Sequence, residues 1–176
     1  ALHIPGEERP AGRNKRLTPL YEKLKAKGAV YTQAYGWERP KWFSLDGREE
    51  DLSFRRNNVF DVVGEEVKAI QERVGVIDLS SFAKFKVTGK DALPFLNRVT
   101  ANRVGRKDGS VSLTHALNPD GRIESEFTVT RFSETDFYVL SGAAAEMRDM
   151  DILVQAQQEG EDIQISNITD DYGILV

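Results

Sequence analysis

Cysteine is absent from the 176 residues of the chain, which excludes disulfides, thiolate nucleophiles and cysteine-based metal sites. Histidine is nearly absent: His3 and His115 lie too far apart in the sequence to indicate a metal site, and His115 is expected to be a partly buried structural residue. No apolar run approaches the roughly 20 residues needed to cross a bilayer. The first residues also lack the basic-then-apolar order of a signal peptide. We therefore expect neither a bound metal nor a membrane span.

Common nucleotide-binding and hydrolase motifs are also missing. No G-x-G-x-x-G follows a strand-like segment and no P-loop Gly-Lys-Ser/Thr occurs, so neither a dinucleotide fold nor a P-loop lies within these residues. The sequence has no G-x-S-x-G elbow and no H-E-x-x-H helix. Any redox cofactor is thus expected to bind elsewhere.

Charge is modest but unevenly placed. The net charge is −4, yet residues 1–44 hold 9 Lys or Arg against 4 Asp or Glu. The basic run at residues 13–16 could contact an anion or nucleic acid. Because no aromatic residues interleave with it and the pI is about 5.3, we favour packing on acidic surface of the same protein. No nucleic-acid partner is expected.

The chain nevertheless contains enough apolar material for a core. With 40% hydrophobic residues and 9 Phe, it is expected to be one domain or part of a larger one. Its ends favour a part, because Ala1 is not an initiator Met and the apolar run 172–176 resembles a buried strand that stops without a turn.

The first third of the chain predicts two helices on either side of an aromatic loop. Thr18 as N-cap and Pro19 at the first helical position begin a short helix that stops at Gly28. Residues 35–43 are expected to form a loop whose Trp and Phe side chains dock on a neighbouring surface. Apolar residues at three- and four-residue spacing predict a second helix over residues 65–74.

From residue 82 onward, strand and helix periodicities alternate. The helix expected over residues 143–158 carries a stripe of Met147, Met150 and Val154, which should face the core. The order β-α-β-β-β-α-β predicts an α+β domain with ferredoxin-like wiring. The other expected elements are a helix at 91–99 and strands at 83–87, 110–117, 123–132, 137–140 and 163–165.

The clearest local feature is a β-hairpin. Residues 118–121, Asn-Pro-Asp-Gly, have the chemistry of a type I turn. After the turn, apolar and polar residues alternate, so Glu124 and Glu126 share one polar face. That face is either simply solvated or the place of a functional acid, for which Glu126 is the candidate.

Aromatic residues could form a ligand surface on these strands. The simpler interpretation, that they belong to the core, is preferred for most of them. The candidates are Phe82, Phe85, Phe127, Phe132, Phe137 and Tyr138.

Several stretches in order resemble one known family. GVIDLSSFAKFKVTGKDALPFLNRVTANRV at residues 75–104 and LNPDGRIESEFTV at residues 117–129 resemble the folate-binding fold of the glycine cleavage T-protein, or aminomethyltransferase, family. GWERPKWF at residues 36–43 and FRRNNVFDVVGEEVKAIQERVGVIDLSSF at residues 54–82 are similar to the folate-binding part of dimethylglycine and sarcosine dehydrogenases. The resemblance covers nearly the whole chain.

The resemblance implies a tetrahydrofolate-binding domain that follows a flavin-dependent amine-oxidising domain in one polypeptide. Residues 1–58 would be a basic and aromatic linker segment, and residues 59–176 the first half of the folate-binding domain, truncated at its C-terminus. The missing domain would use FAD to oxidise an N-methyl amine, such as dimethylglycine or sarcosine, to an iminium. This domain would transfer the one-carbon unit to tetrahydrofolate as 5,10-methylenetetrahydrofolate. By itself the fragment is expected to be inactive and to bind folate weakly or not at all.

The same resemblance implies site residues. Family enzymes place an acid, usually Asp, beside the pterin, and the aligned residue here is Glu126, the expected catalytic group. Phe82, Leu113 and Thr128 are its expected cofactor-binding neighbours. The chain departs from the common pattern at three positions, where the family has an aromatic residue at 113, Gly at 122 and Asp at 126. These departures motivate an alternative, a non-catalytic folate-binding or interaction module.

Partners and compartment also follow from the resemblance. The expected partners are a reduced folate, an amine-derived iminium and the FAD-binding domain of the same polypeptide. A stand-alone T-protein is a third option, against which the GWERPKWF segment argues. The bacterial cytoplasm and the mitochondrial matrix both suit such a chain.

Overall fold

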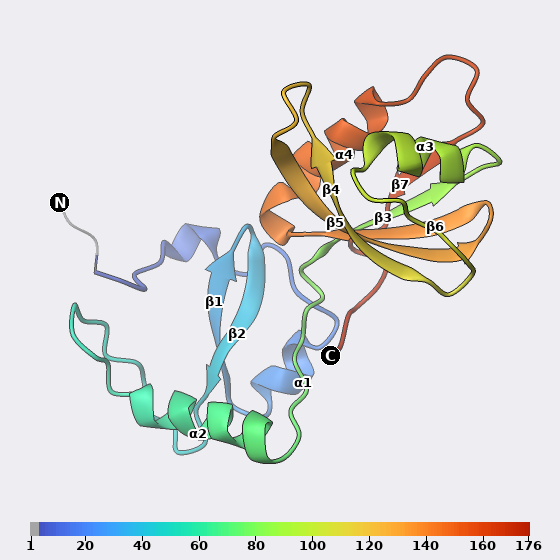
Figure 1. Cartoon of the computed structure of the whole chain (residues 1–176). Coiled ribbons are helices and arrows are strands. Elements are labelled where there is room, and N and C mark those ends of the chain that lie inside the picture. Colours follow the sequence, from blue (N-terminus) through green and yellow to red (C-terminus); the bar gives the residue numbers. More distant parts are fainter. Residues whose placement is uncertain (1–3) are drawn as a thin grey trace. The chain divides into compact units, whose positions relative to one another are not determined.

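The computed structural model describes residues 4–176, which fall into two compact units (Figure 1). The first unit comprises the chain up to Ser81 together with Gly173–Val176, and the second is Phe82–Tyr172. His3 lies outside the described residues. No helix in the described part of the chain is long and apolar enough to cross a membrane. The expected division of the family's domains after residue 58 stays a prediction.

An antiparallel hairpin forms the centre of the first unit, with β1 (Ala29–Ala34) paired to β2 (Trp37–Phe43). The prediction of a loop over residues 35–43 is therefore wrong, because only Tyr35 and Gly36 turn the chain and the rest is strand. Pro40 is compatible with β2 because a two-stranded ribbon leaves strand edges unpaired. The expected docking of aromatic side chains is confirmed, since Trp37 and Trp42 are 3% and 1% exposed.

The first helix is shorter than predicted and begins differently. After a short 3-10 turn, η1 (Pro10–Gly12), the helix α1 spans only Tyr21–Lys25, and no side chain caps it. The prediction that Thr18 is its N-cap is wrong. The Thr18 hydroxyl instead donates to Asp78 Oδ2 at 2.5 Å, so it is not available to the helix terminus.

Helix α2 (Phe60–Glu72) begins five residues before the predicted start, and its predicted apolar stripe lies in solvent. Val67 and Ile70 are 49% and 51% exposed. Glu66 attaches the helix to the hairpin, because its Oε1 accepts the backbone N–H of Phe43 at 2.7 Å. The predicted helix is confirmed, but its apolar stripe does not form a core face of this unit.

The last residues pair with residues 77–79 rather than forming a buried strand. The Leu79 N–H donates to Ile174 O at 2.9 Å, and Ile77 and Val176 exchange backbone hydrogen bonds at 2.8 and 3.1 Å. The side chain of Val176 is nevertheless 69% exposed. The prediction of a buried strand at residues 172–176 is therefore wrong with respect to burial.

The basic run packs on acidic surface of its own unit, as expected. Arg13 donates from Nη2 and Nε to Glu38 at 2.6 and 2.8 Å, and the Asn14 N–H donates to the same carboxylate at 2.7 Å. Arg13 also contacts Glu8 at 3.1 Å. Glu38 is fully buried, so this ion pair holds the N-terminal segment against β2.

Replacing Glu38 by Gln tests this pair through its pH dependence. The hydrogen bond from Arg13 lowers the pKa of Glu38, burial opposes it, and the Asn14 N–H adds to the lowering. Because the folded pKa lies below the unfolded value of about 4.3, the stabilisation is present above that value and is lost as the pH falls through the folded pKa. We expect Glu38→Gln to cost about 1.5–3 kcal/mol at pH 7. Urea unfolding followed by the fluorescence of the neighbouring Trp37 measures this cost. A cost that does not shrink below pH 4 would contradict the assignment.

The second unit is built on a five-stranded antiparallel sheet of order β4-β5-β6-β3-β7. Strands β6 and β7 flank β3 and are joined through α4, which is the split β-α-β arrangement of ferredoxin-like folds. The predicted α+β class and the predicted order of elements are confirmed. Relative to the four strands of a ferredoxin-like fold, the predicted strand β4 is an additional strand at the edge of the sheet. The bounds are β3 (Ala83–Thr88), α3 (Ala92–Val99), β4 (Val111–Leu117), β5 (Ile123–Ser133), β6 (Asp136–Ser141), η2 (Ala143–Ala145), α4 (Glu146–Gln155) and β7 (Gln164–Asn167).

One face of this sheet and the two helices enclose the core. The core cluster joins alternate residues of the strands to both helices, with Phe85, Phe127 and Phe137 from the sheet and Phe95 and Leu153 from α3 and α4. All five of these side chains are 0% exposed. The apolar residues that alternate along the strands therefore lie on the face that the two helices cover.

Helix α4 presents a different face to the core than its methionines suggested. Met147 and Val154 are 74% and 44% exposed, whereas Asp149 and Leu153 are fully buried. The prediction that the stripe of Met147, Met150 and Val154 faces the core is wrong except at Met150, which packs against the cluster. Asp149 is accommodated because the Ser125 hydroxyl donates to its Oδ2 at 2.8 Å. Apolar spacing cannot reveal a buried acid with a partner.

Candidate functional site

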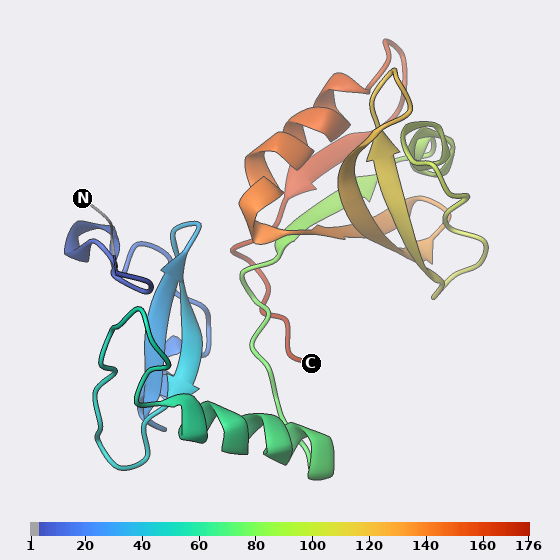
Figure 2. The same cartoon turned by 60° about the vertical axis from the view of Figure 1, so that its left-hand side comes forward.

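The second face of the five-stranded sheet carries the candidate site. Both helices of the unit pack on the opposite face through the core cluster, and Figure 2 shows α4 (orange) alongside β7 (red). Alternation places Leu113 and His115 of β4 on this open face, together with Glu126 and Thr128 of β5. The open face, as we use the term, is formed by these four residues and by Tyr138 and Leu140 of β6.

A tight turn and a one-residue register shift together determine which residues of β4 and β5 face each other. Gly121 N–H donates to Asn118 O at 2.9 Å, with Gly121 at φ +76°, and the Asn118 side chain accepts from the N–H groups of Asp120 and Arg122 at 3.0 and 2.9 Å. The predicted turn is confirmed. The register then shifts by one residue between Leu117 and Ala116, and beyond this shift Leu113 pairs with Thr128.

Glu126 has a partner that the sequence argument did not assign to it. The register places His115 directly opposite Glu126, and His115 Nε2 lies 3.3 Å from Glu126 Oε2. The His115 side chain is 32% exposed, which agrees with the expectation of a partly buried residue, and that of Glu126 is 62% exposed. Counting pairs outward from the turn would not have revealed this neighbour, because the register shifts by one residue: Leu117 pairs with Ile123, but Ala116 pairs with Ser125. The pair combines an acid with a group that can hold or donate a proton.

The expected neighbours Leu113 and Thr128 lie next to this pair. They form the cross-strand pair adjacent to His115 and Glu126 on the same face, and Thr128 is paired on its other side with Leu140. Leu113 is 57% exposed, while Thr128 and Leu140 are half-buried. The structure thus brings an acid, a histidine and an apolar row together on one surface.

Phe82, the remaining predicted site residue, does not belong to a strand of the open face. It immediately precedes β3 and is half-buried. Its carbonyl oxygen accepts a hydrogen bond from Nζ of the fully buried Lys84 at 3.0 Å, and Lys84 also donates to Thr169 O at 2.9 Å. These bonds fix the backbone of Phe82 at the start of the strand. No hydrogen bond or ring contact among the described residues joins Phe82 to Glu126.

The remaining aromatic candidates divide between the two faces. Phe85, Phe127 and Phe137 belong to the core, as the simpler interpretation held. Phe132 is 60% exposed, and its ring centroid lies 6.3 Å from that of Tyr138. Burial raises the pKa of Tyr138, with a smaller contribution from Tyr172, so its hydroxyl stays protonated and can donate a hydrogen bond on the open face.

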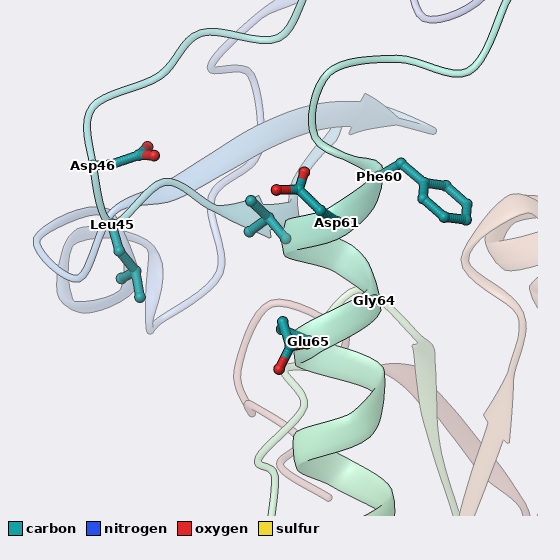
Figure 3. Close-up of a pocket in the computed structure, with 7 residues that line it drawn as sticks. Leu45, Asp46, Phe60, Asp61, Gly64 and Glu65 are labelled. Atoms are coloured by element: carbon teal, nitrogen blue, oxygen red, sulfur yellow. The ribbon is translucent and has the colours of Figure 1, made fainter.

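A separate pocket of about 760 Å³ lies in the first unit beside α2. In Figure 3, Asp46 and Asp61 lie on the same side of α2, while Phe60 points to the other side. Arg48 bridges the two carboxylates at 2.8 and 3.2 Å, and its hydrogen bond lowers the pKa of Asp46. An acid that stays ionised and is already paired is a poor proton donor or acceptor at neutral pH. We therefore do not assign chemistry to this pocket.

Metal chemistry finds no support in the described residues. Within residues 4–176, no group of three or more His, Cys, Asp or Glu side chains is placed to hold a metal ion. The pair of His115 and Glu126 provides only two such groups.

The sequence of the chain is similar to those of several known proteins. The model of the GCVT N-terminal domain matches residues 20–176. Mouse mitochondrial dimethylglycine dehydrogenase is 41% identical over 175 residues, covering 97% of this chain and 20% of that protein. The mouse mitochondrial pyruvate dehydrogenase phosphatase regulatory subunit is 35% identical over 147 residues, covering 80% of this chain and 17% of that protein. The chain thus spans about a fifth of the length of these relatives.

A solved structure resembles the chain in fold. The glycine cleavage system aminomethyltransferase T from Bartonella henselae superposes with a TM-score of 0.69 at 22% identity, covering 89% of this chain and 39% of that one. At this identity the likeness concerns the fold. It agrees with the mixed, antiparallel architecture described above.

Proposed function

Because the chain belongs to the GCVT N-terminal domain family, we propose that the open face of its second unit is one wall of a reduced-folate site. The site serves the transfer of a one-carbon unit to tetrahydrofolate as 5,10-methylenetetrahydrofolate. The single observation that carries the proposal is the pair of His115 and Glu126 at 3.3 Å beside the apolar row of Leu113 and Leu140.

The chemistry of the open face fits a pterin. A flat heterocycle needs an apolar surface for its ring and a few polar groups for orientation. Leu113 and Leu140 supply the apolar surface, and the Thr128 and Tyr138 hydroxyls supply hydrogen bonds. When bound, tetrahydrofolate supplies the nucleophilic nitrogen of the reaction.

Each proposed residue role follows from its position. Glu126 accepts a proton or stabilises positive charge beside the ring, which a carboxylate does well where water is partly excluded. His115 positions the Glu126 carboxyl group through their contact. Thr128 and Leu113 bind the ring next to that pair, and Phe82 contributes an aromatic edge at the start of β3.

The proposed context is a longer flavoenzyme. The relatives include dimethylglycine dehydrogenase and a 4-methylaminobutanoate oxidase from Paenarthrobacter nicotinovorans. We propose that the whole protein oxidises an N-methyl amine to an iminium with FAD, and that this chain receives the one-carbon unit. The residues present do not fit FAD, because they lack a G-x-G-x-x-G segment after a strand. We propose that the FAD-binding domain lies elsewhere in the same polypeptide, and that the whole protein works in the mitochondrial matrix or the bacterial cytoplasm.

Replacing Leu113 by Arg tests the folate surface. In the full-length protein, a guanidinium at this position removes apolar contact area and introduces a charge, so we expect the affinity for 5-formyltetrahydrofolate to fall by about tenfold or more. Isothermal titration calorimetry measures the change. Leu45→Arg is the matched control, because Leu45 is 87% exposed in the first unit. An equal loss in both variants, or no loss in either, would place the folate elsewhere.

The 176-residue chain by itself gives a second measurement. We expect weak or undetectable binding of the same reduced folate, because an open sheet face offers only one wall. Tight stoichiometric binding to residues 1–176 in calorimetry would contradict the expectation that this chain holds only part of the site.

A second candidate function is a non-catalytic folate-binding or interaction module. One specific observation favours it: the pyruvate dehydrogenase phosphatase regulatory subunit is named for regulation rather than for a reaction. Leu113, Arg122 and Glu126 also differ from the residues common in the T-protein family. The two functions predict different outcomes for substitution of Glu126.

A further inference from the structure

A polar pocket lies at the start of β4, at one edge of the five-stranded sheet. Its volume is about 450 Å³. Three of its lining residues belong to the loop that leads from α3 to β4, namely Asn102, Arg103 and Arg106, and Ser110 ends that loop. Leu113 completes the wall, so the pocket and the open face share a residue.

Two arginines that line this pocket have no acidic partner in the described part of the chain. Neither Arg103 nor Arg106 makes an ion pair or a side-chain hydrogen bond within the described part of the chain, and both are exposed. Elsewhere in the same unit, arginine is paired with an acid: Arg98 contacts Glu161 at 2.6 Å. Two neighbouring guanidinium groups without a carboxylate produce a local positive potential in a chain whose net charge is −4.

Ser110 provides an independent indication. Its Oγ is buried and has no hydrogen-bond partner. A buried hydroxyl without a partner is costly, and this one belongs to a residue that lines the pocket. Arg131 does not use it, because its side chain is bonded to Asp108 at 2.7 Å and to Gly105 O at 2.8 Å. Because the Oγ has no exposed surface, the Ser110 side chain has to turn toward the pocket before a ligand oxygen can accept its hydrogen bond.

We propose that this pocket binds an anionic oxygen group, a carboxylate or a phosphate. Arg103 and Arg106 supply guanidinium donors, whose planar geometry matches two oxygens of such a group. The Ser110 hydroxyl donates a further hydrogen bond, and the Asn102 side chain is held in place by its own bond to Leu113 O at 2.9 Å. The anion is either free in solution or part of a ligand whose ring lies on the open face, because Leu113 belongs to both surfaces.

The first experiment titrates inorganic phosphate into the isotope-labelled 176-residue chain and follows amide shifts by NMR. We expect saturable shifts at residues 102–113, and an affinity lowered about tenfold in the double variant Arg103→Gln with Arg106→Gln. Ser110→Ala should lower the affinity by about twofold to fivefold without lowering the melting temperature. Arg122→Gln is the matched control, because Arg122 is an exposed arginine of the same unit outside the pocket.

The second experiment distinguishes the two sources of the anion in the full-length protein. It compares 5-formyltetrahydrofolate carrying one glutamate with the same compound carrying three. An affinity gain from the additional carboxylates that disappears in the arginine double variant assigns the pocket to a ligand on the open face. Phosphate binding without such a gain assigns it to a free anion.

The proposal is overturned if phosphate causes no saturable shift at residues 102–113. It is also overturned if Arg122→Gln weakens phosphate binding as much as the double variant does. The phosphate titration does not depend on the proposed folate function, so failure to bind any folate, with phosphate binding intact, would remove that function and leave this site.

Discussion

Replacing Glu126 by Gln in the full-length protein is expected to lower the rate of methylenetetrahydrofolate formation by about 100- to 10,000-fold, the range for loss of a general acid–base group. Gln keeps the size and hydrogen-bonding shape of the side chain but can neither accept a proton nor carry negative charge. The position of Glu126 opposite His115, at 3.3 Å, is otherwise retained. Reduction of the flavin by the amine should continue, because the proposed function assigns that step to another domain. Stopped-flow absorbance of the flavin and chromatography of the folate products measure the two steps separately.

Glu124→Gln is the matched control for this experiment. Glu124 lies on the same strand and the same polar alternation, two residues away, and is exposed. The same change of charge there should alter the transfer rate by less than about twofold, since exposed surface charges contribute little. A full effect at Glu126 with none at Glu124 supports the enzyme. Unchanged product formation in both variants would support the non-catalytic module instead.

The hairpin was predictable because its signals are local. An Asn-Pro-Asp-Gly turn sets the reversal of the chain, and alternation after it sets the side of Glu126, so both follow from a short stretch of residues. The pairing of His115 with Glu126 was not accessible by the same reasoning, because the register shifts by one residue between Ala116 and Leu117. What the sequence could not provide is the choice between Glu124 and Glu126, which came from the family resemblance.

Predictions failed where contacts between distant residues decide the outcome. Thr18 has the composition of a helix cap, but its hydroxyl is bonded to Asp78, 60 residues away. The methionines of α4 have the spacing of a core stripe, but the buried face contains Asp149, whose partner Ser125 lies on β5. In each case a long-range hydrogen bond determined the orientation, and local propensity carries no information about it.

The open face itself could be inferred only in part. Alternation along β5 separates Phe127 and Val129 from Glu126 and Thr128, and the structure places these pairs on opposite faces. Sequence alone does not say which face the helices cover when both contain apolar residues, as in β4, where Leu113 is 57% exposed and Ala116 is 1% exposed. The covered face is fixed by packing of α3 and α4, which involves contacts across the whole unit.

Residues of β5 alternate between the open face and the core, so the position of the open-face side chains depends on how the core residues of the same strand pack. Phe127 is fully buried between Glu126 and Thr128 in sequence and packs in the cluster with Phe85 and Phe137. Truncating a buried Phe removes apolar contacts and leaves a cavity, at a cost of about 3–5 kcal/mol. That cost is a large part of the roughly 5–15 kcal/mol that stabilises a typical domain. Phe127→Ala is therefore expected to have the largest effect on stability of the substitutions considered.

Urea unfolding followed by circular dichroism, and amide hydrogen exchange in β5 and β6, measure the effect of Phe127→Ala. Phe132→Ala is the matched control: Phe132 lies on the same strand, is 60% exposed, and its ring is tilted against that of Tyr138 with the centroids 6.3 Å apart, so a loss below about 1.5 kcal/mol is expected. Phe127→Leu should lie between them, because it keeps most of the buried volume. If Phe127→Ala costs no more than Phe132→Ala, the helices do not cover the face assigned to them, and Glu126 would then point into the core rather than toward a ligand.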